Sequence, residues 1–161
     1  MTATIDETET EVELRELVYS MIRMLKPELV VETGAYLGGM TATLGVAVRD
    51  NGVGRVVSCE TDFVFLKRAM QRCRELPVAF YAGPSTVVPE LERADFLFLD
   101  SDYQYRGDEI RRAKPGATIV IHDAFKSYDP NVPPLADSIR AAGGLCWPCG
   151  IDGRGFGILI K

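Results

Sequence analysis

Short apolar runs alternate with segments of helical periodicity along almost the whole chain. We expect strands at residues 28–33, 55–60, 78–83, 95–100 and 115–123, and two more within residues 145–161 around a glycine-rich turn. The spacing of apolar residues and the helix start and stop signals predict helices at 7–25, 40–50, 63–76, 87–93, 106–113 and 133–144. Strands that alternate with helices form a parallel sheet covered on both faces. The pattern therefore predicts an α/β fold with a doubly wound, mostly parallel seven-stranded sheet and an antiparallel C-terminal hairpin.

A chain of 161 residues with 47% hydrophobic and 25% charged residues has the size and composition of one globular domain. We place that domain at residues 8–161 and expect the polar, acidic residues 1–7 to be disordered. The net charge of −5 argues against nucleic acid as a partner. No apolar run approaches the roughly 20 residues of a membrane span, and the start MTATIDETETE is acidic, unlike a signal peptide. We therefore expect no membrane partner and a cytoplasmic location.

The sequence CWPC places Cys146 and Cys149 at the spacing of a redox pair or of half a zinc site. The other cysteines, Cys59 and Cys73, do not have the spacing of a second zinc pair. A redox pair would open a helix, whereas a glycine-rich turn follows this one. We therefore interpret the pair as ordinary strand cysteines.

Polar residues follow the predicted parallel strands, at the edge where sheets of this kind bind their ligands. The candidate site consists of five strand ends: Glu32 to Gly38, Glu60 to Asp62, Gly83 to Ser85, Asp100 to Tyr103, and His122 to Asp123. Four of these five strand ends carry a carboxylate. The ligand should therefore have groups that a carboxylate can bind.

The turn after the first predicted strand differs from the dinucleotide-binding fingerprint G-x-G-x-x-G. Tyr36 stands where the second glycine would let the backbone approach a pyrophosphate. Glu32, just before the turn, would repel a pyrophosphate but would attract a cationic ligand. Glu60 ends the next strand, 26 residues after Gly34, where an acid commonly accepts two ribose hydroxyls. Together these residues favour S-adenosylmethionine, a sulfonium nucleoside with a free amino group.

The motifs VVETGAYLGGMT, VVSCETD, AGPS and DFLFLDSDYQY...KPGATIVIHDA resemble the class I S-adenosylmethionine-dependent methyltransferases. They are most similar to the catechol and caffeoyl-CoA O-methyltransferase-like group and its small bacterial relatives. The resemblance covers residues 11–161 in order and implies the Rossmann-like methyltransferase fold. It implies that the cofactor is bound by Glu32, Gly34, Ala35, Tyr36, Gly38, Glu60, Thr61, Gly83, Ser85 and Asp100.

The resemblance also bears on metal binding. Metal-dependent members of the group hold one divalent ion with an acid at the position of Asp100 and an Asp-Asn pair at the end of the fifth strand. This chain has His122 and Asp123 in place of that pair. The implied site for Mg²⁺ or Mn²⁺ therefore consists of Asp100, His122 and Asp123, although one histidine suits a hard cation less well than oxygen ligands do.

A second role for His122, the only histidine, is that of general base toward the acceptor hydroxyl. The lysine that is the base in the catechol enzymes would fall near Tyr103, so that base is absent here. An imidazole with an ordinary pKa of about 6.5 suits proton abstraction at neutral pH. His122 and Asp100, which the resemblance places beside the reactive methyl group, are thus the predicted catalytic residues.

The predicted function is S-adenosylmethionine-dependent O-methylation of a small-molecule hydroxyl. Two alternatives stay open: a non-catalytic module that binds S-adenosylmethionine, and a nucleotide-dependent Rossmann oxidoreductase. The chain is short for the group, with little to cover the acceptor. That shortness predicts a bulky acceptor, a lid from the partner in a homodimer, or no catalysis.

Overall fold

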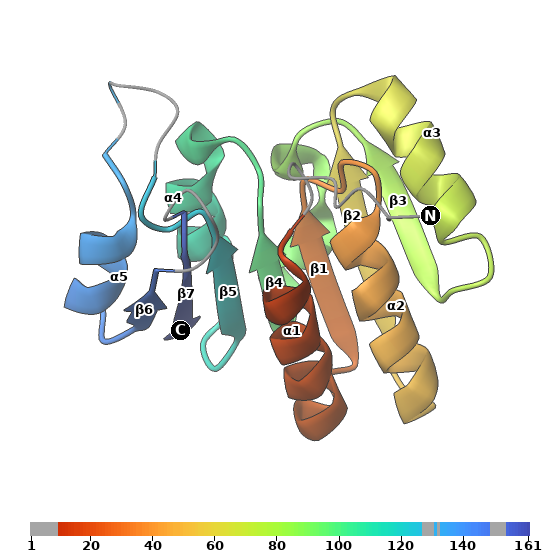
Figure 1. The fold of residues 1–161 in the computed structure, drawn as a ribbon, viewed down its shortest axis with the longest axis horizontal. Coiled ribbons are helices and arrows are strands. Elements are labelled where there is room, and N and C mark those ends of the chain that lie inside the picture. The colour runs from red at the N-terminus through yellow and green to blue at the C-terminus, as the bar shows by residue number, and fades with distance from the viewer. Residues whose placement is uncertain (1–9, 127–130, 132, 149–153) are drawn as a thin grey trace, which may run out of the picture.

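A computed structural model describes residues 10–126, 131, 133–148 and 154–161. They form a seven-stranded sheet of order β3-β2-β1-β4-β5-β7-β6 (Figure 1). The strands are β1 (Leu29–Thr33), β2 (Arg55–Glu60), β3 (Val78–Ala82), β4 (Phe96–Leu99), β5 (Thr118–His122), β6 (Leu145–Trp147) and β7 (Phe156–Ile160). The first five are parallel, and β7 runs antiparallel to β5 and β6. The predicted sheet is therefore confirmed. The predicted disorder of residues 1–7 and the domain boundary at residue 8 lie outside the described residues.

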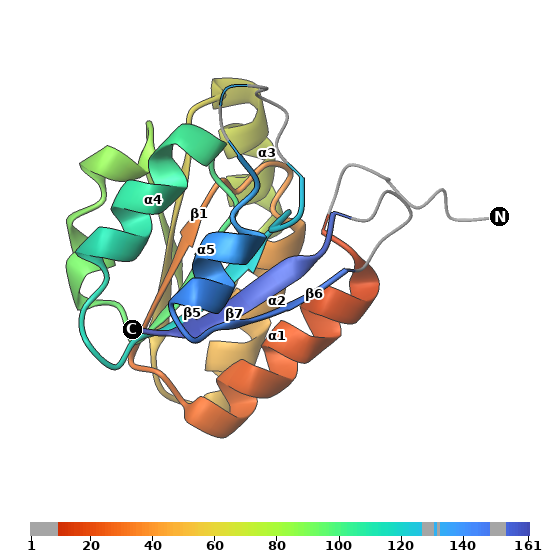
Figure 2. The same ribbon diagram turned by 90° about the vertical axis from the view of Figure 1, so that its left-hand side faces the viewer.

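Helices cover both faces of this sheet, as Figures 1 and 2 show. They are α1 (Val12–Leu25), α2 (Gly39–Asn51), α3 (Phe63–Arg72), α4 (Tyr103–Arg112) and α5 (Ala136–Ala141). The helix expected at residues 87–93 is instead two short 3-10 helices, η1 (Ser85–Val87) and η2 (Pro89–Arg93). Pro89 opens the second of them, and because proline lacks a backbone N–H it cannot continue a preceding helix.

Two apolar clusters hold the layers together, one on each face of the sheet. Adjacent residues of β1 point to opposite faces, so Val30 joins the cluster under α1 and α2 while Val31 joins the other. Leu14, Val18 and Ile22 follow one another at helical spacing and form the buried face of α1. The fully buried strands explain why the sequence shows continuous apolar runs there and not an alternating pattern.

The order of the strands positions the site. β1 pairs in parallel with β2 on one side and with β4 on the other. The chain therefore reverses its direction of winding at β1, and the ends of β1 and β4 face one crevice. All five parallel strands present their carboxyl ends at this same edge, which brings the predicted site residues together.

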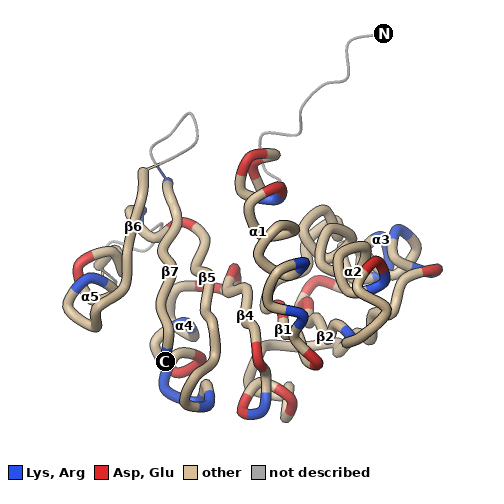
Figure 3. The backbone as a smooth tube through the Cα atoms, turned by 90° about the horizontal axis from the view of Figure 1, so that it is seen from below, with Lys and Arg blue, Asp and Glu red and all other residues tan. Residues whose placement is uncertain are grey.

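Charged residues of both signs are interspersed over the described chain (Figure 3). Among the described residues, none of the helices combines the length and the apolar composition that a membrane crossing requires. The expected partners and the homodimer stay predictions.

Candidate functional site

The turn between β1 and α2 is packed closely against the end of β4. Gly34 has φ +85°, and a Cβ on it would lie 2.4 Å from the backbone oxygen of Asp100. Gly38 has φ +80°, and its Cβ would lie 2.9 Å from the Cα of Ala69. Tyr36 also has a positive φ, 47°, which is uncommon outside glycine. Only glycine allows the contact at Gly34, so this residue shapes the site by joining β1 to β4.

Glu32 lies fully buried under this turn. Thr41 Oγ1 and Ser58 Oγ donate to its Oε2 at 2.5 and 2.6 Å, whereas its Oε1 has no hydrogen-bond partner among the described residues. Burial raises the pKa of Glu32 to about 7, against the opposing effect of these two hydrogen bonds. A buried carboxylate oxygen without a donor is a costly arrangement. A cationic ligand group against the turn that covers Glu32 would offset part of that cost.

Glu60 ends β2 and is fixed by the backbone. The amide of Tyr36 donates to Oε2 at 2.7 Å, and the amide of Asp62 donates to Oε1 at 2.9 Å. Thr61 Oγ1 also donates to Oε1, at 3.3 Å, whereas Oε2 has room for a further hydrogen bond. The carboxylate is thus held in one orientation at the rim of a hollow.

That hollow has a volume of about 290 Å³ and lies at the carboxyl ends of the strands. Seven of the ten residues predicted to bind the cofactor line it: Gly34, Tyr36, Glu60, Thr61, Gly83, Ser85 and Asp100. The remaining three, Glu32, Ala35 and Gly38, do not line it, and Gly38 packs on α3. Seven further residues that were not assigned to the cofactor complete the lining: Cys59, Asp62, Phe65, Pro84, Ser101, Asp102 and Tyr105.

One wall of the hollow is supported from α4. Ser101 Oγ donates to Oε1 of the buried Glu109 at 2.7 Å. Burial raises the pKa of Glu109, while hydrogen bonds and the charge of Arg106 act in the opposite direction. This contact ties the loop after β4 to the helix that follows it.

Beside the hollow, His122 is buried between three carboxylates. Its Nδ1 lies 3.0 Å from Asp100 Oδ1, and its Nε2 lies 2.8 Å from Glu11 Oε2. Asp123 Oδ1 is 3.7 Å from the same Nε2. Burial alone would lower the pKa of His122, but the charges and hydrogen bonds of these carboxylates raise it to about 10. These contacts favour the protonated form of the imidazole.

Two arginines complete this cluster. Arg154 Nη2 lies 3.2 Å from Glu11 Oε1, and its Nε lies 3.7 Å from Asp123 Oδ1. Arg106 Nη2 lies 3.3 Å from Asp100 Oδ1. The hydrogen bond from His122 lowers the pKa of Glu11 to about 2, although burial opposes the shift. The cluster thus consists of alternating positive and negative groups.

This arrangement bears on both predicted roles of His122. A general base at neutral pH needs a neutral imidazole with an available lone pair, and the pKa of about 10 and the two hydrogen bonds oppose that role. For a metal, the structure does bring Asp100, His122 and Asp123 together, with one ligand atom from each within 4.8 Å of the others. Arg106 Nη2 lies 3.3 Å from Asp100 Oδ1 and Arg154 Nε lies 3.7 Å from Asp123 Oδ1, and these two positive charges oppose the binding of a cation there.

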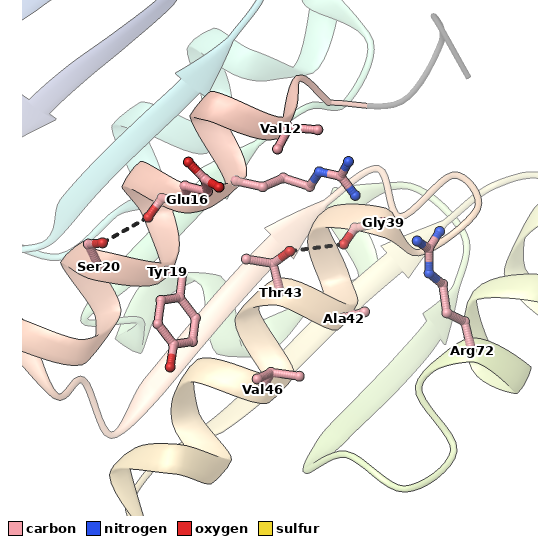
Figure 4. A pocket seen from close by; sticks show the side chains of 10 residues that line it. Val12, Glu16, Tyr19, Ser20, Gly39, Ala42, Thr43, Val46 and Arg72 are labelled. Atoms are coloured by element: carbon pink, nitrogen blue, oxygen red, sulfur yellow. Dashed lines mark hydrogen bonds between the residues drawn. The ribbon is translucent and has the colours of Figure 1, made fainter. Parts of the chain in front are cut away.

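A larger groove of about 660 Å³ runs between the outer faces of α1 and α2 (Figure 4). Its floor includes Ala42, Thr43 and Val46, and Arg72 of α3 lies at one end. The groove contains neither Glu32, Glu60 nor Asp100. The smaller hollow therefore has the chemistry of a nucleoside site, and the larger groove does not.

Comparison with known proteins supports a methyltransferase fold. No protein-family model and no curated protein sequence matches the chain. Among solved structures, the O-methyltransferase TomG from Streptomyces achromogenes, in complex with S-adenosylmethionine, is 18% identical, with a TM-score of 0.76 over 98% of this chain and 83% of TomG. An O-methyltransferase from Bacillus cereus with S-adenosylhomocysteine is 18% identical, with a TM-score of 0.73 over 95% of this chain and 83% of its own. The methyltransferase PaMTH1 from Podospora anserina, bound to S-adenosylhomocysteine, is 17% identical, with a TM-score of 0.71 over 97% and 81%.

At these identities the likeness shows a shared fold. The chain thus has the Rossmann-like fold of S-adenosylmethionine-dependent O-methyltransferases, as the resemblance of its motifs implied.

The sequence did not reveal Glu11, Arg106 or Arg154 as parts of the site. One available signal was the position of Arg106, which shares a face of the predicted helix with Glu109, Ile110 and Ala113. A charged residue on a helix face that is otherwise turned to the core needs a buried partner. Glu11 and Arg154 carry no comparable signal.

Proposed function

We propose that this protein is an S-adenosylmethionine-dependent methyltransferase that methylates a hydroxyl of a small molecule. The observation that carries the proposal is the pair of fixed acids, Glu32 and Glu60, on either side of the glycine turn. Glu60 is oriented by two backbone amides at the rim of the hollow, and Glu32 has an oxygen without a donor. The hydroxyls of a ribose would satisfy Glu60, and the charge of Glu32 would attract an ammonium group that lies against the turn covering it.

The residues of the hollow suit the parts of this cofactor. In the proposal, Glu60 accepts the two ribose hydroxyls, Ser85 lies against the adenine, and the turn from Gly34 to Gly38 lies against the methionine part, above Glu32. When bound, the cofactor supplies an electrophilic methyl group on a positively charged sulfur. The structures of TomG and of the Bacillus cereus enzyme, which share the fold, contain S-adenosylmethionine and S-adenosylhomocysteine respectively. Their contents support the choice of cofactor.

Asp100 marks the reactive end of the hollow in this proposal. It lines the hollow at the end of β4, and His122 and Arg106 fix its carboxylate from behind. Asp102 and Tyr105 line the hollow next to it. Asp100, Asp102 and Tyr105 would position the acceptor oxygen for direct attack on the methyl group, and such positioning would supply much of the rate.

The surroundings of His122 narrow the class of acceptor. Both of its ring nitrogens face carboxylates, which favour its protonated form, so we do not propose it as the base that removes the proton of the acceptor. We therefore propose an acceptor with an acidic hydroxyl, such as a phenol or an enol. Its oxygen would form the new bond to carbon as the sulfur–carbon bond breaks, and its proton would pass to solvent.

The test is formation of S-adenosylhomocysteine, measured by mass spectrometry, with a panel of phenols, enols and aliphatic alcohols. We expect turnover with the acidic hydroxyls and none with the alcohols. Glu60→Gln should lose turnover, and Glu75→Gln, an exposed acid in the segment between α3 and β3, should retain it. Cofactor binding without turnover on any acceptor would contradict the enzymatic proposal and leave a binding module.

A further inference from the structure

Arg106 is a charged residue fixed inside the protein. Its side chain is 2% exposed. Its Nε donates to the backbone oxygen of Ser101 at 2.8 Å, and its Nη1 donates to the backbone oxygen of His122. Its guanidinium lies 4.4 Å from the centre of the Tyr103 ring. Two carbonyls, an aromatic ring and a carboxylate therefore hold this cation in one place.

That place is next to the residues that would bind a metal. Arg106 Nη2 contacts Asp100 Oδ1 at 3.3 Å, and Nη1 contacts the carbonyl of His122 at the end of β5. A divalent ion bonded to the same oxygen of Asp100 at roughly 2.1 Å would lie at most about 5.4 Å from this nitrogen. At that distance, in a buried site, the two positive charges repel each other strongly.

The rest of the cluster already pairs its acids with positive groups. The carboxylates of Glu11, Asp100 and Asp123 face two guanidinium groups, of Arg106 and Arg154, and the imidazole of His122. Both ring nitrogens of His122 lie within hydrogen-bonding distance of a carboxylate, so neither offers a free lone pair in this arrangement. A hard cation is bound by acidic oxygens whose charge is not already neutralised.

We propose that Arg106 supplies the positive charge that a divalent ion would bring to the ends of β4 and β5, and that the Asp100–His122–Asp123 cluster works without a metal. Arg106 is a positioning residue in this view, since it fixes the Asp100 carboxylate and the end of β5 from behind the hollow. One consequence is that the enzyme should stay active in the presence of a chelator, and this consequence rests on the proposed function. The exclusion of the ion is independent of the proposed function, and it can be measured on the protein without cofactor or acceptor.

The experiment is a titration of the full chain with Mn²⁺, followed by the electron paramagnetic resonance signal of the free ion. We expect the wild type to bind Mn²⁺ no more tightly than a dissociation constant of about 1 mM, as a weak surface acid would. Arg106→Gln removes the fixed charge and keeps a polar side chain, and we expect its affinity for Mn²⁺ to rise at least about tenfold. Arg106→Lys should bind Mn²⁺ as weakly as the wild type does, because lysine retains the positive charge. Arg111→Gln, on the exposed side of α4, is the matched control and should change nothing.

Circular dichroism establishes that each variant is folded before it is titrated. A wild type that binds one equivalent of Mn²⁺ at micromolar concentration, and loses it in Asp123→Asn, would overturn the proposal whether or not Arg106→Gln folds. If folded Arg106→Gln bound Mn²⁺ no better than the wild type, Arg106 would not be what excludes the ion, and the proposal would also fail. Absence of cofactor binding would refute the proposed function alone and leave the result of this titration intact.

Discussion

The contact between Glu11 and His122 gives a prediction for stability that depends on pH. Glu11→Gln replaces the carboxylate 2.8 Å from His122 Nε2 by a neutral amide of similar shape. The pKa of Glu11 falls from 4.5 to about 2, which corresponds to about 3 kcal/mol at 1.36 kcal/mol per pKa unit. The pKa of His122 rises further, from 6.5 to about 10, because it contains the effects of Asp100 and Asp123 as well. The smaller change therefore describes this single contact better, and we expect Glu11→Gln to lose about 2–3 kcal/mol.

The sign of the pH dependence follows from the two shifts. The lowered pKa of Glu11 contributes stability that is present above its ordinary value of 4.5 and is lost as the pH falls toward 2. The raised pKa of His122 contributes stability that is fully present below 6.5 and is lost as the pH rises through about 10. Both contributions are complete between about pH 4.5 and 6.5. The difference between wild type and Glu11→Gln should be largest there and should shrink toward pH 10.

The assay is urea unfolding of wild type and Glu11→Gln at pH 5.5, 8 and 10. Glu16→Gln, an exposed acid on the same helix, is the control and should stay within about 0.5 kcal/mol of wild type at each pH. An equal loss in Glu11→Gln at pH 5.5 and pH 10 would show that the contact does not depend on the charge of His122. Our description of the cluster would then be wrong.

Three further predictions concern the hollow and the turn. Because the pKa of Glu32 is raised to about 7, S-adenosylmethionine should bind with proton release near pH 6.5, and Glu32→Gln should remove that release in calorimetry across buffers of different ionisation enthalpy. Gly34→Ala should lose about 2–4 kcal/mol in urea unfolding, from a strained φ and the contact with Asp100, whereas Gly116→Ala, at φ +83° with no atom within 4 Å, should lose only about 1 kcal/mol. For a series of phenols, kcat/KM should rise with pH according to the pKa of each acceptor; a common rise near pH 6–7 would restore His122 as the base.

The fold could be predicted from the sequence because its signals are local. Strands buried on both faces produce apolar runs such as LVVET and FLFL, and glycines or prolines separate these runs from the helices. The boundaries of the elements were predicted less well than their order. Pro89 begins a 3-10 helix where a longer helix was expected, and α5 is shorter than its apolar pattern predicts. These boundaries depend on how the segments pack against one another, and the local sequence pattern carries no information about that packing.

The site could be predicted only in part. Glu60 and Asp100 were found because the ends of parallel strands meet at one edge, a rule that depends on topology alone. The protonation of His122 could not be predicted in this way, because it depends on Glu11, which is 111 positions away in the sequence. An ordinary imidazole pKa was the reasonable expectation until this partner was seen. Contacts between distant segments thus bear directly on whether His122 is a base, and the role of base stays a prediction.

The most direct test of the central claim is calorimetric titration of wild type and Glu60→Ala with S-adenosylmethionine and with NAD. The account predicts that wild type binds one equivalent of S-adenosylmethionine and does not bind NAD. Loss of the charged acceptor in Glu60→Ala should weaken S-adenosylmethionine binding by roughly 2–4 kcal/mol. Unchanged affinity in Glu60→Ala, or tighter binding of NAD than of S-adenosylmethionine, would contradict the assignment of this hollow as the cofactor site of a methyltransferase.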